Sequence, residues 1–355
     1  MSQSRTRFFL VGSAAVVAAG LAVGTVAYMG GLPRALASQA GPDELGLIPS
    51  GAAVVAYANV RDVMASEFRH KLTSAVDTKG EGREKFYEQT GIDCERDIDT
   101  VVAAVLPEAM GGTEFGLLAL RGRFDTVKIE GLVAAKGGVM DEYRGARLLL
   151  PPADADVDGQ QDHQGRRHPH PVIALVDANL VMVGTRDAVQ AAIDRHHGEG
   201  SNSILADGEF VRMLDTLESD STAWAIGRAS VLMAGQGLPA EVTVPGMAGD
   251  LSALQWVAAS GHVNGGLRAT LQAEASTADA GQNLRELVQG VVALARLQAE
   301  GRPELKTFLQ TLQVEGSGTG VAVRIALPAD TLDLLVGQMA RQAARDHLPR
   351  SVPAE

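Results

Sequence analysis

The residues best suited to bind a metal ion lie in one polar stretch, residues 151–171. Three aspartates alternate there ahead of a glycine, in the order Asp154, Asp156, Asp158 and Gly159. This is the first half of the calcium-loop pattern D-x-D-x-D-G, in which alternating carboxylates converge on one hard cation. Asp162 falls at the ninth position, but the twelfth, which carries a bidentate glutamate in calcium loops, is Gly165. The sequence supplies part of a calcium site, and a solvated acidic loop is the alternative.

Histidines of the same region offer a second kind of metal site. Five of the eight histidines fall between positions 163 and 197, namely His163, His168, His170, His196 and His197. Imidazole is a good ligand for zinc, copper and nickel. Near His163, His168 and His170, however, Arg166 and Arg167 would repel a cation. His196 and His197 end a predicted helix, where a protonated histidine interacts favourably with the helix dipole, which is a structural reason for their position. The candidate metal ligands are Asp154, Asp156, Asp158, Asp162, His163, His168 and His170, with calcium or a transition metal as the ion and no other cofactor expected.

The remaining polar clusters do not match the spacing that catalysis requires. Glu95, Asp97 and Asp99 surround the one cysteine, Cys94, but they precede a predicted strand, where acidic residues commonly cap turns. The glycine-rich run 316–320 has glycine where a nucleophile elbow needs serine, and it opens a strand instead of the helix of a phosphate loop. We therefore expect a protein that is not an enzyme. An exported hydrolase with catalytic residues far apart in the sequence is an alternative.

The composition is that of a folded, acidic protein. The 355 residues are 46% hydrophobic and 21% charged, which excludes a disordered tail or a disulfide scaffold. With 31 basic and 43 acidic residues, the net charge of -12 argues against nucleic acid as a partner, because phosphate backbones bind basic surfaces. An aromatic content of 4% argues against stacking platforms for bases or sugars.

An uncharged apolar segment sets the expected location. Phe8 to Met29 contains no charged side chain, and its length as a helix, about 33 Å, exceeds a hydrocarbon core of about 30 Å. Arg5 and Arg7 precede it, and no acidic residue appears before Asp43. The positive-inside rule then keeps the N-terminus in the cytoplasm. We expect a single-pass protein that contacts the cytoplasmic membrane through residues 8–30 and whose body is extracytoplasmic (periplasmic).

Cleavage of this segment is the alternative to an anchor. Ala35-Leu36-Ala37 matches the A-x-A pattern of a signal peptide ending at residue 37, although the apolar run is longer than the usual 7–15 residues. Both interpretations export an acidic body. Within the segment, Gly20 and Gly24 form G-x-x-x-G, which allows two helices to pack closely. A homodimer through this helix is therefore possible, and the alternative is that glycine is simply common in membrane helices.

Strand and helix signals alternate along the exported body. The pattern predicts strands at 53–57, 101–106 and 115–120, and helices from residue 59 to about 73, from 81 to 89 and from 125 to 135. Three hairpins follow, with turns at 177–179, 264–266 and 316–318, and helices at 187–196, 279–300, 304–310 and 331–345. In the strand after Gly266, apolar and polar residues alternate, as expected when one face is buried and the other wet.

Hairpins followed by helices predict an α+β fold, with antiparallel sheets and helices on one face, preceded by one transmembrane helix. The expected division is a cytoplasmic stub and anchor (1–32), a tether (33–44), a first half (45–234) with a mobile insertion at 151–171, and a second half (250–347). We expect the boundary between the two halves in the Gly- and Pro-rich stretch 235–250. Trp224 and Trp256 lie in strand-like runs and are expected to fill the core.

Four stretches of the chain carry a resemblance. They are the anchor ending in Gly30-Gly31-Leu32-Pro33, the run Ile48-Pro49-Ser50 ahead of VVAYANVRDVM, the run TGIDCERDID, and Val181 to Asp194. Together they resemble uncharacterised bacterial proteins with an N-terminal anchor and an exported α+β body. The resemblance implies location and general fold and carries over no activity. The expected function is a membrane-anchored, non-enzymatic protein that contacts other envelope proteins; the alternatives are an envelope metal-binding protein using residues 154–197 and an exported hydrolase.

Overall fold

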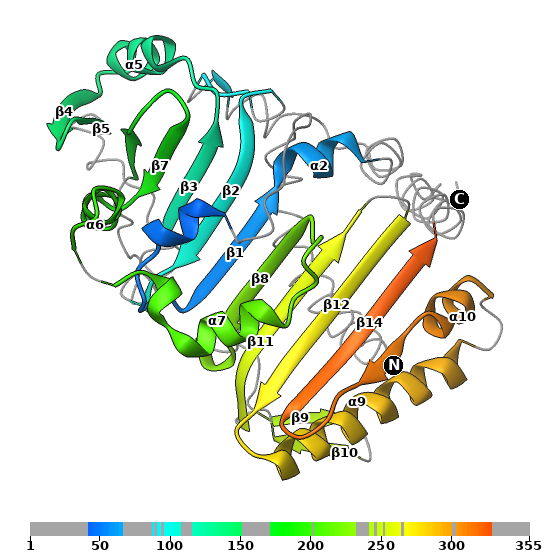
Figure 1. Cartoon of the computed structure of the whole chain (residues 1–355). Coiled ribbons are helices and arrows are strands. Elements are labelled where there is room, and N and C mark those ends of the chain that lie inside the picture. The colour runs from blue at the N-terminus through cyan, green and yellow to red at the C-terminus, as the bar shows by residue number, and fades with distance from the viewer. Residues whose placement is uncertain are drawn as a thin grey trace, which may run out of the picture.

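The computed structural model describes residues 42–66, 87–88, 91–93, 96–107, 116–150, 171–200, 202–231, 241–244, 247–250, 253–263, 266–299 and 303–328. Their main feature is one twelve-stranded antiparallel sheet, with helices packed against it (Figure 1). The predicted mixture of helices with a large antiparallel sheet is confirmed. Among the described residues no helix is both long and apolar enough to span a bilayer, and the predicted membrane segment, residues 8–30, lies outside them.

The strand order across the sheet is β13-β14-β12-β11-β8-β1-β2-β3-β7-β6-β5-β4. The central strands are β1 (Val54–Asn59), β2 (Ile98–Val105), β3 (Leu117–Gly122) and β8 (Ala223–Arg228). On one side of them lie β7 (Leu180–Gly184), β6 (Val172–Leu175), β5 (Ala146–Leu150) and the edge strand β4 (Val139–Tyr143). On the other side lie β11 (Leu254–His262), β12 (Gly266–Ala275), β14 (Gly320–Pro328) and the edge strand β13 (Gln313–Glu315). A separate pair is formed by β9 (Glu241–Val244) and β10 (Met247–Asp250).

Helices cover both faces of the sheet. One core forms under η1 (Asp43–Leu47), α6 (Arg186–His196), η4 (Ile204–Ala206) and α7 (Gly208–Asp215). The other forms under α2 (Val60–Ala65) and α5 (Thr126–Ala135). Neighbouring strand residues belong to different cores, Val102 to the first and Val101 to the second. The expectation of helices on one face is therefore wrong for these strands, because β1, β2 and β3 are apolar on both faces and each face needs a cover.

The three predicted hairpins are confirmed, as β6–β7, β11–β12 and β13–β14. The helices predicted after them are present as α6, α9 (Ala278–Gln298) and α10 (Pro303–Gln310). Gly316 and Gly318 have positive φ values of 131° and 54°, which explains why the last turn uses glycine. The predicted closing helix, residues 331–345, lies outside the described residues.

Other element predictions need correction. The helix expected to run to about residue 73 ends at Ala65, because Ser66 adopts an extended backbone with ψ 142°. Its N-cap is Asn59, as the sequence indicates. The hairpin β4–β5 and helix α7 were not predicted at all. The sheet is continuous from β8 to β11 through six residue pairs, and the division of the chain into two halves stays a prediction.

Candidate functional site

The predicted metal ligands, from Asp154 to His170, lie outside the described residues, and so do Gly20, Gly24 and Cys94. Within the described part of the chain, no group of three or more His, Cys, Asp or Glu side chains could hold a metal ion. His196 and His197 do end α6, where their rings contact each other at 5.6 Å between centroids. This is the position at the negative end of the helix dipole that the sequence predicts for them.

The two described acids of the Cys94 cluster have structural partners. The carboxylate of Asp97 accepts a hydrogen bond from the backbone N–H of Asp93 at 2.7 Å. Asp99 forms an ion pair with Arg61 of α2, with 2.5 Å between Oδ1 and Nη2. The Asp97 contact closes the turn ahead of β2, as expected for a capping acid. Asp99 instead lies inside β2 and joins this strand to α2.

The short helix η1 carries a buried carboxylate. The side chain of Glu44 is 3% exposed and pairs with Arg121 of β3. Burial, together with the nearby carboxylates of Asp62 and Glu44, raises the pKa of Tyr57 to about 12. Tyr57 therefore stays protonated at physiological pH, and it packs against the indole of Trp224 with 5.8 Å between ring centroids. The group fixes η1 on the sheet and offers a hydrogen-bond donor, without a nucleophile beside a base.

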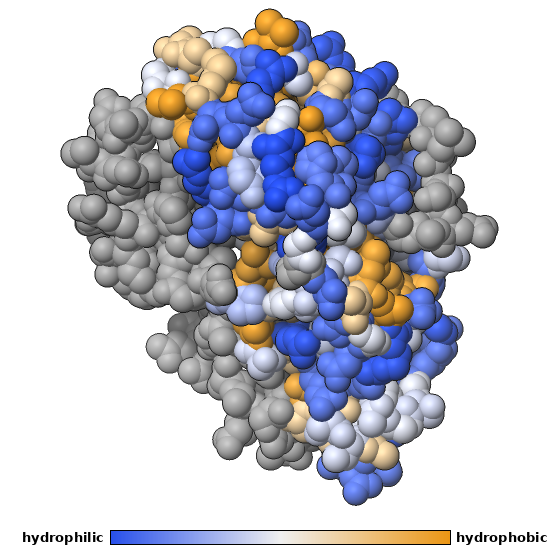
Figure 2. Space-filling view, turned by 60° about the vertical axis from the view of Figure 1, so that its left-hand side comes forward, coloured by the Kyte–Doolittle hydropathy of each residue, from blue (hydrophilic) through white to orange (hydrophobic). Residues whose placement is uncertain are grey.

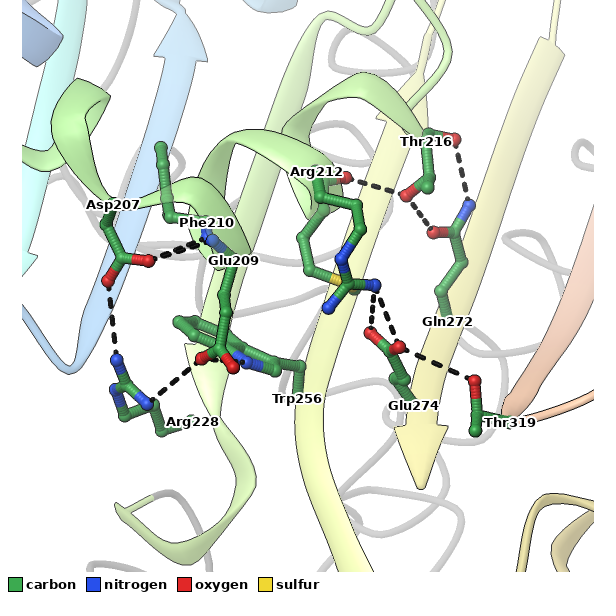
Figure 3. Close-up of polar contacts among 11 residues, drawn as sticks. Asp207, Glu209, Phe210, Arg212, Thr216, Arg228, Trp256, Gln272, Glu274 and Thr319 are labelled. Atoms are coloured by element: carbon green, nitrogen blue, oxygen red, sulfur yellow. Dashed lines mark hydrogen bonds and ion pairs between the residues drawn. The ribbon is translucent and has the colours of Figure 1, made fainter. Parts of the chain in front are cut away.

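A second cluster of polar side chains holds the start of α7 against the sheet (Figure 3). The guanidinium of Arg228 lies 4.5 Å from the ring centroid of Trp256 and pairs with Asp207 at 3.4 Å and Glu209 at 3.6 Å. The indole N–H of Trp256 donates to Glu209 at 3.3 Å. Asp207 also caps α7 by accepting from the backbone N–H of Phe210. As predicted, Trp256 is buried in the core, at 2% exposed.

The polar residues of β12 meet the segment 212–220, as Figure 3 shows for its first two contacts. Four side-chain contacts follow in order: Arg212 with Glu274, Thr216 with Gln272, Glu218 with Thr270, and Asp220 with Arg268. Thr270 is 4% exposed as a result. This face is thus partly covered, and Arg268 is still 53% exposed, so the expectation of a solvent-facing side holds only in part. Sequence alternation shows two unlike faces of a strand, but it carries no signal of a polar cover about 50 residues away in the chain.

Several exposed apolar side chains lie on α5 and β4. Val127 is 75% exposed, Val139 51% and Met140 46%, which makes three of the seven large apolar side chains exposed among the described residues. Figure 2 shows hydrophobic atoms at the upper end of the molecule, where α5 and β4 lie in Figure 1. These exposed side chains were not predicted, because the hairpin β4–β5, whose turn is Arg144-Gly145, was not recognised and its first strand is an edge of the sheet.

The far end of β4 is fixed to α6. The hydroxyl of Tyr143 donates to Asp194 at 3.0 Å, and Arg144 pairs with Asp194 at 2.8 Å and Glu199 at 2.6 Å. Arg186 of α6 also pairs with Asp141 in the middle of β4. These contacts hold the edge strand in place while its other groups face solvent. Most of these polar groups thus serve to position elements, and the contacts with α6 are the ones that position the β4 edge.

No protein-family model matches the chain, and no curated protein matches it. A solved structure described as "Structure of crystal form I of TP0453" aligns over 85% of this chain and 99% of that chain. The alignment has a TM-score of 0.44 and a sequence identity of 11%. Likeness at this level assigns neither a fold family nor a function.

Proposed function

We propose that the chain is a non-enzymatic protein of the cell envelope that acts through contacts with other proteins. The observation that carries the proposal is that Val127 of α5 and Val139 and Met140 of the edge strand β4 are exposed apolar side chains. Exposed apolar side chains on an edge strand commonly mark interaction sites. The less exposed carboxylates instead pair within the chain, as Glu44 does with Arg121 and Glu274 with Arg212.

The location within the envelope is part of the same proposal. Its support is the apolar segment 8–30 with Arg5 and Arg7 before it. Anchored there, the chain holds an acidic α+β body on the outer side of the cytoplasmic membrane, where envelope proteins are its partners. Packing of Gly20 and Gly24 across two copies would make the anchor a dimer. A reporter fused at the C-terminus should be active outside the cytoplasm, and activity confined to the cytosol would contradict this location.

Photo-crosslinking in intact cells tests the contact surface. A photoreactive phenylalanine analogue is placed at Met140 of the full chain, and a matched one at Leu205, which is 48% exposed on η4. We expect a discrete protein adduct from position 140 and none from position 205. The absence of any adduct from positions 127, 139 and 140 would contradict contacts at this surface, and equal adducts from position 205 would show that the capture is unspecific.

A further inference from the structure

We propose that β4 is a detachable edge strand, held against β5 by ion pairs with α6 and the residues after it, and that rising ionic strength releases it while the rest of the sheet stays folded. The inference goes beyond the proposed function and does not depend on it, because it concerns how the strand is held and not what the strand contacts. The burial of β4, its backbone pairing and its ion pairs carry the inference.

The strand β4 buries little apolar surface. Val139 is 51% exposed and Met140 46%, and Asp141 and Glu142 are exposed as well. Within β4, Tyr143 is the residue that packs against a core, and its hydroxyl donates to a carboxylate of α6. In the neighbouring strand β5, by contrast, three of the five residues are buried. The hydrophobic effect therefore contributes little to holding β4 on the sheet.

Backbone hydrogen bonds join β4 to one neighbour. Tyr143 pairs with Ala146 across a two-residue turn, and the pair that closes such a turn is hydrogen-bonded. Alternation along the ladder then places hydrogen-bonded pairs at residues 141 and 148 and at residues 139 and 150. Among the described strands, β4 pairs with β5 alone. Water competes for these groups at an exposed edge, so the bonds break more readily there than in a central strand.

Charged side chains supply the remaining attachment. Asp141, in the middle of the strand, forms an ion pair with Arg186 of α6. Arg144, in the turn after the strand, pairs with Asp194 of α6 at 2.8 Å and with Glu199 at 2.6 Å. Helix α6 is itself fixed to the body of the protein by its buried residues. The five paired side chains are between 25% and 61% exposed, so dissolved salt screens all three pairs.

An ion pair on β12 provides a comparison. The pair of Arg212 with Glu274 is also exposed to salt, since the arginine side chain is 51% exposed. The strand that it reaches, β12, has hydrogen-bonded neighbours on both sides, β11 and β14. Breaking this pair leaves β12 held by two ladders, whereas breaking the pairs of β4 leaves one ladder at the edge. Ion pairs of similar strength therefore matter more for the attachment of β4.

Release of β4 changes the edge of the sheet. It frees the N–H and C=O groups of residues 146, 148 and 150, which bond to β4 in the closed state. The strand β5 stays in place, because it also pairs with β6 and has buried residues on both faces. The edge thus has a closed state, covered by a charged strand, and an open state that ends at β5, and ionic strength sets the balance between them.

Hydrogen exchange of the full chain in detergent micelles, read by mass spectrometry at single residues, tests the inference. The reporters are the amides of Asp141 and Leu148, which bond across β4–β5, and the reference is the amide of Leu149, which bonds to β6. We expect the reporters to exchange through local opening, with much less protection than the reference. Raising sodium chloride from about 20 mM to about 500 mM should lower their protection about three- to ten-fold relative to the reference.

Two variants at arginines of similar exposure separate the ion pairs of β4 from a general effect of charge. Arg186→Gln removes the pair with Asp141 and should lower the protection of the reporters about two- to five-fold at low salt. Arg212→Gln removes the pair with Glu274 and should leave the reporters unchanged. The urea midpoint of each variant shows that it is folded. Reporters that are as protected as the reference, that do not respond to salt, or that respond equally to the two variants overturn the inference.

Discussion

At the scale of single residues, Arg228 of β8 joins the start of α7 to Trp256 of β11. Its guanidinium lies over the ring of Trp256 and meets the carboxylates of Asp207 and Glu209 at the start of α7. Because the arginine side chain is 43% exposed, water screens the two ion pairs, and each contributes little alone. The contact of the flat guanidinium with the indole face is the part that a lysine ammonium does not reproduce.

Replacing Arg228 should separate the contribution of the ring contact to the free energy of unfolding from that of the positive charge. We expect Arg228→Ala to lower the free energy of unfolding by about 1 kcal/mol. Arg228→Lys keeps the charge and loses the planar contact, so its loss should fall between zero and that of alanine. Urea denaturation followed by circular dichroism measures both. A lysine variant as unstable as the alanine variant would mean that charge contributes nothing here.

Tyr57 makes the stability of the fold sensitive to alkaline pH. Burial raises its pKa from 10.0 to about 12 in the folded state, so the folded state binds the phenolic proton more tightly than the unfolded chain does. The stabilisation is complete below pH 10 and is lost as the pH rises from 10 to 12. Between pH 9 and pH 11.5 the unchanged chain should lose about 1–2 kcal/mol more than Tyr57→Phe, which has no proton to release. If the free energy of unfolding of the unchanged chain and that of Tyr57→Phe changed equally with pH, Tyr57 would not be the cause of the alkaline loss of stability.

At the scale of elements, close backbone packing sets where helix α9 can lie. A Cβ atom added at Gly281 would come within 2.4 Å of the carbonyl oxygen of Gly318, in the turn between β13 and β14. Arg285, one turn further along the helix, donates to the carbonyls of Gly318 and Gly320 at 2.8 Å each. The helix therefore rests on the turn through a glycine and is fixed there by an arginine.

Two glycine-to-alanine changes test this packing. Gly281→Ala should destabilise the protein by about 1–3 kcal/mol, because the backbone of the turn must move. Gly131→Ala in α5 meets no atom within 4 Å, so it should stabilise by about 0.5–1 kcal/mol through helix propensity alone. The two urea midpoints should shift in opposite directions. A stabilised Gly281→Ala would show that the helix does not touch the turn.

Local signals were enough to predict most elements. Turn residues with apolar flanks indicated β6–β7, β11–β12 and β13–β14, because hairpins join neighbours in sequence. The hairpin β4–β5 was missed because its first strand, VMDEY, is polar and exposed, and its turn contains arginine at φ 50°. Helix α7 was missed because it has eight residues and begins with glycine, which is a poor helix former.

The candidate sites were less predictable than the elements. The contacts of Glu274 with Arg212 and of Arg268 with Asp220 join residues 62 and 48 positions apart, and no local pattern encodes such pairs. The packing of helices on both faces of the sheet was also not predictable. The run VVAAV at residues 101–105 of β2 is apolar at every position, so its pattern does not indicate which helix covers which face. The predicted metal ligands lie in residues 154–170, outside the described residues, and stay a prediction.

At the scale of the whole molecule, the sheet joins the parts of the chain on either side of residues 232–252. Six residue pairs connect β8 with β11, from Arg228 opposite Trp256 to Ala223 opposite Gly261. Trp224, Ile226, Trp256 and Ala258 belong to one core. The polar contacts from the segment 212–220 to β12 cross the same boundary. A strand pair, a shared core and side-chain contacts thus connect the two parts.

This connection predicts one cooperative unfolding transition. The two tryptophans lie on the two sides of the β8–β11 pair, Trp224 on β8 and Trp256 on β11, and the chain has no others. Each of the variants Trp224→Phe and Trp256→Phe keeps one indole as a reporter of its own side. Within each variant, the urea midpoint from the remaining indole should coincide with that from far-ultraviolet circular dichroism, because coincident probes are the mark of two-state unfolding. If the Trp256 signal changed at lower urea than the Trp224 signal, the strands from β11 onward would unfold as a separate unit, and the shared sheet would not make the two parts cooperative.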